Sequence, residues 1–161
     1  MQQSKIINIE DRKLVGLSIQ TCLAENKTRE LWQTFRPLVK EVSNTVNTDF
    51  YSLQVYDNDF GIKPFTPQTE FEKWAAVEVS NFDNIPKNLK SFILAGGDYA
   101  VFIHKGTPQQ FHKTASYIYG EWLPKSNYQL DNRPHFEIIP ENNKLDDPSA
   151  EEEVWIPIKL K

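Results

Sequence analysis

This chain of 161 residues repeats one order of predicted elements in its two halves. The first half reads as a strand at 13–21, a helix at 26–44 and two strands at 49–57 and 72–80, because its apolar residues recur at alternating or helical spacing. Pro37 lies inside the helical segment, where it predicts a kink or a late start of the helix. The same order recurs in the second half, which limits the folds that the chain can adopt.

The second half opens with SFILAGGDYAVFIH (91–104), which is predicted to be a hairpin because its central glycines take positive φ at little cost. A helix is predicted at 107–125, where Thr107 and Gln110 form a capping box and Pro124 is expected to end the helix. The segments PHFEIIP and EEVWIPIKL then supply two more strands.

Each half is therefore a strand–helix–strand–strand unit, and the two units are offset by roughly 85 residues, which indicates an internal duplication. We expect one α+β domain spanning residues 1–161, with an antiparallel sheet that carries two helices on one face and leaves the other face open. The acidic stretch at 142–153 is expected to be a solvated loop before the last strand.

Composition argues against several classes of protein. The net charge of −4 does not favour binding to nucleic acid or to an anionic membrane. Cys22 is the single cysteine, so an internal disulfide cannot form and nothing in the sequence indicates an oxidising compartment. No segment has the length and apolar character of a membrane span or a signal peptide, so we expect a cytoplasmic protein.

A glutamate interrupts the apolar strand in RPHFEIIP (133–140). Because side chains alternate across a strand, the pattern predicts that Phe136 and Ile138 face the helices and that Glu137 faces the opposite side of the sheet. A carboxylate among large apolar residues is costly unless it meets a partner. The strand therefore raises the question of what Glu137 meets on its own face.

The neighbouring strands are expected to place aromatic and acidic side chains on the same face as Glu137. This set consists of Tyr56, Trp74, Glu78, His135, Glu153 and Trp155, with Gln54 nearby. Aromatic faces attract cations by about 0.5–2 kcal/mol each, and a carboxylate in an apolar wall gains a strong partner in a cation. The pattern thus predicts a binding site for a lipophilic cation.

Simpler explanations compete with this interpretation. A glutamate in a strand is more often solvated or paired with a neighbour such as Arg133, and Trp74 and Trp155 can be rim or interface residues. The three histidines of the chain lack metal-ligand spacing, and no glycine-rich phosphate loop precedes a helix. We therefore expect neither a metal nor a cofactor.

Longer segments of the chain resemble a known family. The run GGDYAVFIHKGTPQQFHKTASYIYGEWLPKSNYQLDNRPHFEIIP, followed by EEEVWIPIK, is similar to the GyrI-like family, and WAAVEV in the first half fits the same pattern. Members are effector-binding domains at the C-terminus of some AraC-type and MerR-type transcription regulators, or free-standing proteins. The resemblance covers nearly the whole chain and is densest from residue 96 to 158.

The resemblance implies a duplicated fold whose groove binds small molecules, often amphipathic cations such as drugs and dyes. In multidrug-sensing members a buried glutamate in the strand that matches HFEIIP contacts the positive ligand, which implies this role for Glu137. The matching segments also imply groove positions for Glu153, Trp155 and Trp74. The regulators carry a helix–turn–helix, whereas the first predicted strand here begins at residue 13, so we expect no direct binding to DNA.

Three functions follow as alternatives. The first is binding of an aromatic or amphipathic cation, with Glu137 as its charge partner. The second is hydrolysis of a cyclopropane-bearing electrophile, with Glu137 as general base and Tyr56, Tyr99 or Tyr119 as proton donor. The third is interaction with a protein partner, such as a regulator or DNA gyrase, and exposed tryptophans leave room for a homodimer.

Overall fold

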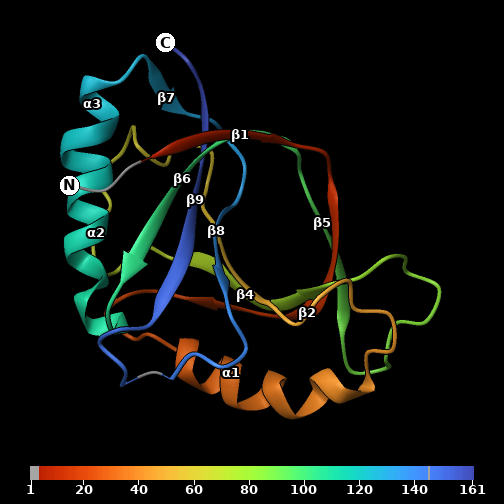
Figure 1. The fold of residues 1–161 in the computed structure, drawn as a ribbon. Helices are drawn as coiled ribbons and strands as arrows, with labels where there is room; N and C mark the ends of the chain where they lie inside the picture. The colour runs from red at the N-terminus through yellow and green to blue at the C-terminus, as the bar shows by residue number, and fades with distance from the viewer. Residues whose placement is uncertain (1–3, 145) are drawn as a thin grey trace.

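The computed structural model describes residues 4–144 and 146–161, and it shows one antiparallel nine-stranded sheet with two helical segments (Figure 1). The strands are β1 (Lys5–Ile9), β2 (Arg12–Thr21), β3 (Phe50–Val55), β4 (Phe71–Glu78), β5 (Lys90–Leu94), β6 (Gly97–Lys105), β7 (Tyr128–Leu130), β8 (His135–Ile139) and β9 (Glu151–Leu160). The helical segments are α1 (Thr28–Phe35) with the 3-10 helix η1 (Arg36–Glu41), and η2 (Pro108–Gln110), α2 (Phe111–Tyr117), the π-helical η3 (Ile118–Trp122) and α3 (Leu123–Lys125). This architecture confirms the α+β prediction. Among the described residues, no helix is long and apolar enough to span a bilayer.

The order of the strands shows how two similar halves are joined. The order is β1-β6-β9-β8-β3-β4-β2-β5, and β7 pairs with β9 at the side. The central pair β3–β8 joins the halves, and equivalent strands follow on either side of it. β1 pairs with β6 and β5 pairs with β2, so each half lends its first strand to the other half. In Figure 1, β1 crosses the top of the molecule and β5 runs down its right side.

This exchange of strands corrects the hairpin predicted at 91–104. β5 and β6 are joined by a tight turn, but β5 pairs with β2, and β6 pairs with β1 and β9. A Cβ at Gly96 would collide with the backbone oxygen of Ile9, so the close approach of the β1–β2 turn requires glycine there. The structure also adds β1, which precedes the first strand that the sequence predicts.

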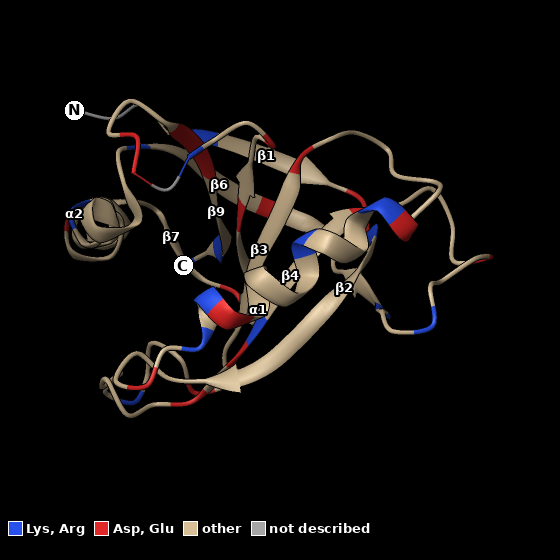
Figure 2. Cartoon of the chain, turned by 90° about the horizontal axis from the view of Figure 1, so that it is seen from below, with Lys and Arg blue, Asp and Glu red and all other residues tan. Residues whose placement is uncertain are grey.

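Both helical segments lie on one face of the sheet, which we call the helix-bearing face. α1 packs Leu31 and Phe35 into a cluster with Val15, Ala75 and Val77 of β2 and β4. The second helical segment forms a separate cluster with β6 and β9. Figure 2 shows α1 and α2 apart from each other, with middle strands of the sheet between them.

The opposite face, which we call the inner face, has a core of its own. The sheet curves around this face, since side chains of the outermost strands β1 and β5 join those of the central strands in one cluster. None of the buried residues in this cluster comes from a helix. They are Leu14, Tyr51, Leu53, Trp74, Ala76, Leu94, Tyr99, Val101, Phe136 and Trp155.

The structure reverses the facing that the sequence predicts for β3 and β8. Phe136 stacks on Trp155 and on Tyr51 of the inner face, with ring centroids 5.2 and 5.8 Å apart. Phe136 and Ile138 therefore face away from the helices, and Glu137 points toward the helix-bearing face. The physical reason is that both faces of this sheet are apolar, so alternation tells which residues share a face but not which face the helices cover.

The ends of the predicted helices agree in part with the structure. The capping box is confirmed, since the backbone N–H of Thr107 donates to Oε1 of Gln110 at 2.9 Å. The first helix changes from α to 3-10 geometry beside Pro37. The second helix ends at Lys125, one residue after Pro124, which agrees with the predicted range 107–125. The π-helical turn before Pro124 loosens the hydrogen-bond ladder where proline lacks a donor.

Candidate functional site

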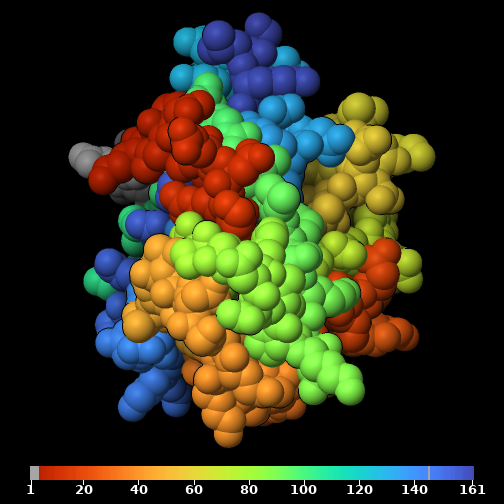
Figure 3. Space-filling view, turned by 90° about the vertical axis from the view of Figure 1, so that its right-hand side faces the viewer, coloured from red at the N-terminus to blue at the C-terminus, as the bar shows by residue number. Residues whose placement is uncertain are grey.

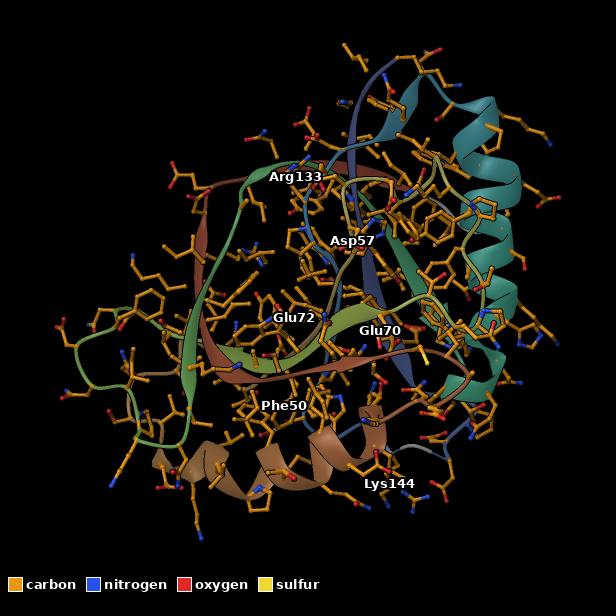
Figure 4. The ribbon with its side chains drawn as sticks, turned by 180° about the vertical axis from the view of Figure 1, so that it is seen from behind. Phe50, Asp57, Glu70, Glu72, Arg133 and Lys144 are labelled. Atoms are coloured by element: carbon orange, nitrogen blue, oxygen red, sulfur yellow. The ribbon has the colours of Figure 1, made fainter. Side chains whose placement is uncertain are left out.

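Glu137 lies in the middle of the helix-bearing face. Its row across the sheet runs from Phe102 and Val154 through Glu137 to Ser52 and Ala75. One end of this row belongs to the cluster under the second helical segment, and the other end belongs to the cluster under α1. The carboxylate therefore stands at the boundary between two separate cores. Figure 4 shows Phe50 of the adjacent strand β3 on the side of the sheet that α1 covers.

The surroundings of Glu137 leave its carboxylate without a charged partner in contact. Nε2 of Gln54 donates a hydrogen bond to its Oε1 at 3.1 Å, and the residue as a whole is half-buried. Among the described residues, no cation comes within 4.0 Å of it. Burial raises its pKa, while the charge of Lys73 opposes this effect. Arg133, the neighbour expected as an alternative partner, pairs with Asp131 at 3.0 Å and lies near β1 (Figure 4).

A lysine faces the same region from the next row of the sheet. Lys73 of β4 pairs with Gln54 of β3, which pairs with His135 of β8, so these side chains share the helix-bearing face with Glu137. The side chain of Lys73 is only 7% exposed. Burial lowers its pKa, whereas the nearby carboxylates of Glu137 and Glu152 act in the opposite direction.

Aromatic rings lie on the other side of Glu137. Tyr56, just after β3, stacks on Phe60 with ring centroids 4.0 Å apart and lies edge-on to His135 at 4.9 Å. The hydroxyl of Tyr119 forms a hydrogen bond of 2.8 Å with Nδ1 of His135. Burial lowers the pKa of His135 to about 3, so its imidazole is neutral near pH 7 and adds no positive charge. Burial also raises the pKa of both tyrosines, so both hydroxyls stay protonated.

The loop between β3 and β4, residues 56–70, carries part of this aromatic group. Nδ2 of Asn132 donates to Oδ1 of Asn58 at 2.7 Å and ties the loop to the segment before β8. Phe60 then lies 5.1 Å from His135 between ring centroids. In the space-filling view of Figure 3, the loop is the yellow region at the right, beside blue residues of the second half. A loop of the first half thus covers residues of the second half.

Tyr119 reaches the region from the π-helical turn η3. Within this turn Ile118 is buried in the cluster with Phe102 and Ile158, while Tyr119 contacts His135. Single π-helical turns are rare and occur frequently at functional sites. The turn therefore places one residue in the core and presents the next to the site.

Four of the predicted site residues lie on the inner face instead. Glu78, Glu153 and Trp155 line an open cavity of about 400 Å³ near the ends of the strands. Trp74 lies apart from this cavity and packs against Phe92, with ring centroids 4.8 Å apart. These residues therefore cannot contact the same small ligand as Glu137 on the other face of the sheet.

An arginine of the chain is part of the wall of this cavity. The guanidinium of Arg12 lies 5.3 Å from the ring centroid of Trp155, and its Nη1 donates to the hydroxyl of Tyr51 at 2.7 Å. That hydroxyl in turn donates to Oε1 of Glu78 at 3.0 Å. The acidic and aromatic groups of the inner face thus have an internal cation.

The predicted site is divided by the sheet. Glu137, Tyr56 and His135 come together on the helix-bearing face, while the other four residues lie on the inner face. Sequence reasoning missed Lys73, although the alternation along EKWAAVEVS already places it on the face that the helices cover. Phe60 lies in a loop, where no periodic pattern could indicate it.

Comparison with known proteins supports a ligand-binding fold. The family described as the GyrI-like small molecule binding domain matches residues 2–159. The transcriptional regulator BrlR of Pseudomonas aeruginosa is 26% identical over 156 residues, which are 96% of this chain and 55% of the regulator. The chain thus spans about half the length of this curated relative.

Solved structures share the fold at low sequence identity. The structure of SAV2435 bound to tetraphenylphosphonium matches with a TM-score of 0.73 and 16% identity, over 98% of this chain and 94% of that chain. The C-terminal domain of EcmrR matches with a TM-score of 0.72 and 15% identity, over 100% and 99% of the two chains. These likenesses confirm the predicted fold.

Proposed function

This chain belongs to the family of GyrI-like small molecule binding domains, and we propose that it binds an aromatic or amphipathic cation at Glu137. The observation that carries the proposal is the position of this carboxylate. Glu137 is half-buried, and its charge raises the pKa of the neighbouring Tyr56. Its carboxylate forms no ion pair among the described residues. SAV2435, which shares the fold, binds the cation tetraphenylphosphonium, and this supports the ligand class.

The energetics favour a cationic ligand. A desolvated carboxylate lacks the stabilisation that water gives its negative charge. A bound cation would stabilise the charge of Glu137 instead and favour its ionised form. The rings of Tyr56, Phe60 and Tyr119 offer stacking and cation–π contacts of about 0.5–2 kcal/mol each. A flat aromatic cation can use both kinds of contact at once.

The inner face is the weaker candidate for the same ligand. Its carboxylate Glu78 already accepts a hydrogen bond from Tyr51, and Arg12 lies over the ring of Trp155. A cationic ligand in the cavity there would lie beside this arginine, which carries a like charge. We therefore place the site on the helix-bearing face.

Titration calorimetry with tetraphenylphosphonium and with neutral triphenylphosphine oxide tests the proposal. We expect Glu137→Gln to weaken binding of the cation by about tenfold or more, because a hydrogen bond or ion pair to a charged group contributes about 1.5–3 kcal/mol. Binding of the neutral compound should change little. The amide keeps the shape of the side chain and the bond to Gln54, so only the charge is removed.

Glu153→Gln is the matched control, since this glutamate lies on the inner face and lines the cavity there. It should bind the cation as the unmodified chain does. If Glu153→Gln weakens binding and Glu137→Gln does not, the ligand occupies the inner face and the role proposed for Glu137 is wrong.

Hydrolysis is a second candidate, and the position of two tyrosines supports it. Tyr56 and Tyr119 lie on the side of Glu137, whereas the hydroxyl of Tyr99 on the inner face donates to the carbonyl of Ala95 at 2.8 Å. Glu137 would act as general base, with Tyr56 or Tyr119 as proton donor. Mass spectrometry of the same samples with a cyclopropane-bearing electrophile separates the two functions. A product that Glu137→Gln fails to form would assign hydrolysis.

We also propose where in the cell the ligand is bound and which proteins respond to it. The cytoplasm is the proposed compartment, because a lone cysteine, Cys22, fits a reducing environment. A regulator or DNA gyrase is the protein partner that the family resemblance implies. The homodimer was expected from exposed tryptophans, but Trp74 and Trp155 are only 5% and 4% exposed. In this proposal such partners respond to the ligand-bound state.

A further inference from the structure

Lys73 is a buried cation for which the chain supplies no partner. It is the only lysine or arginine among the buried residues of the described chain. Its ammonium group carries three donors, yet no hydrogen bond within 3.5 Å or ion pair within 4.0 Å forms there among the described residues. Buried polar groups nearly always have partners, and an unpaired buried charge is costly. Lys73 therefore lacks an acceptor that another molecule can provide.

The ammonium group of Lys73 lies on the side of the proposed site. The sheet register places Lys73 on the same face as Glu137, and the charges of Glu137 and Glu152 both act on it. Gln54 lies between the two strands and bonds to Glu137, while Lys73 remains more than 4.0 Å from that carboxylate. Lys73 and Glu137 thus share one face of the sheet and carry opposite charges, yet they form no ion pair among the described residues.

We propose that Lys73 is a second, oppositely charged contact for the ligand, and that the ligand is an aromatic zwitterion with a cationic group for Glu137 and a carboxylate for Lys73. This inference rests on the binding site proposed above at Glu137. A ligand with only a positive charge would pair Glu137 and leave Lys73 unpaired beside a like charge. A zwitterion gives both residues a charge-assisted hydrogen bond.

The anionic group that fits best is a carboxylate. The charges of Glu137 and Glu152 already act on Lys73, although neither carboxyl group forms an ion pair with it among the described residues. A phosphate would bring excess negative charge next to them, and the repulsion between like charges is strong where water is excluded. A single negative charge balances the single positive charge of the lysine.

Rhodamine B and its ethyl ester provide a matched pair of probes, since they share one aromatic cation and differ only in the carboxylate. We expect the unmodified chain to bind rhodamine B about tenfold or more tightly than the ester, the effect of one charge-assisted hydrogen bond. Lys73→Met keeps a long side chain without charge, so the two dyes should bind it equally. Lys13→Met, at an exposed lysine of β2, is the control and should keep the preference. Titration calorimetry measures the affinity of each dye for each of the three proteins.

Several outcomes would overturn the role of Lys73. Equal binding of the two dyes to the unmodified chain would do so, and so would an unchanged preference in Lys73→Met. Failure of the binding site proposed at Glu137 gives a different result. In that case Glu137→Gln has the same affinity for the ester as the unmodified chain. If circular dichroism shows that Lys73→Met does not fold, Lys73→Arg replaces it. Arginine keeps the charge, so this variant must keep the preference, and its loss would contradict the inference.

Discussion

The charges of three residues affect one another's pKa at the boundary between the two cores of the helix-bearing face. These residues are Glu137, Glu152 and Lys73. Burial raises the pKa of both glutamates and lowers that of the lysine. Each shift opposes the charged form, while the attraction between opposite charges favours it. Opposing shifts at one place are typical of functional sites. The three residues therefore carry a cost in the empty protein that a ligand of matching charge can relieve.

Glu152 makes the stability of the protein depend on pH. Burial, and then the charge of Glu137, raise its pKa from 4.5 to about 7 in the folded state. Between these pH values the folded chain binds more protons than the unfolded chain, so the contribution is present at low pH and is lost as pH rises. We expect the free energy of unfolding to fall by about 1–3 kcal/mol across this range because of Glu152. Urea unfolding at both ends of the range measures it.

Glu152→Gln should remove most of this loss. Glu151→Gln, at the exposed neighbouring position, serves as the control and should retain it. A pH dependence that is the same in Glu152→Gln and in the unmodified chain would show that the carboxyl group of Glu152 is not the cause.

At the scale of elements, the loop at 56–70 and the turn η3 complete the site that the strands begin. β3, β4 and β8 supply the polar groups, whereas the loop brings Phe60 and the π-helical turn brings Tyr119. The loop belongs to the first half of the chain, and the turn belongs to the second half. The aromatic part of the site therefore forms only when both halves are in place.

The ring of Phe60 is expected to contribute directly to binding. Phe60→Ala should weaken the binding of tetraphenylphosphonium by roughly 2- to 10-fold, which corresponds to about 0.5–1.5 kcal/mol for one aromatic contact. Ile62→Ala, in the same loop but 84% exposed, is the control and should bind normally in calorimetry. Tighter binding by Phe60→Ala would mean that this ring occupies the place of the ligand in the empty protein.

At the scale of the whole molecule, the exchange of β1 and β5 makes the duplicated halves depend on each other. β1 completes the sheet of the second half beside β6, and β5 completes that of the first half beside β2. The cluster of the inner face contains residues of both halves, such as Leu14 and Trp155. Neither half can bury its apolar face alone, although each has the full set of elements.

Separate halves should therefore fold only together. A break between Asn84 and Ile85 falls in an exposed loop between β4 and β5. We expect each fragment alone to lack the sheet signal in circular dichroism, because its edge strands and core have no partner. Mixing them should restore the signal and give a one-to-one complex in gel filtration. A stable sheet in either fragment alone would contradict the dependence.

Sequence patterns alone were enough to predict the two strand–helix–strand–strand units, the capping box at Thr107 and a glutamate in the apolar strand β8, but not the strands β1 and β7. These features depend on neighbours along the chain, where periodicity and capping act directly. Alternation also told correctly that Glu153 and Trp155 share a face. It could not tell that Tyr51 and Phe136 share that face as well.

The three-dimensional arrangement was needed to show which face the helices cover, which strands exchange partners, and that Lys73 and Glu137 share a face of the sheet. Each of these depends on pairing between distant segments and on the curvature of the sheet. Because both faces of the sheet are apolar, no local pattern distinguishes them. The apolar strand HFEIIP thus shows that Glu137 needs a partner, whereas the face of the sheet on which Glu137 lies depends on the packing of the whole chain.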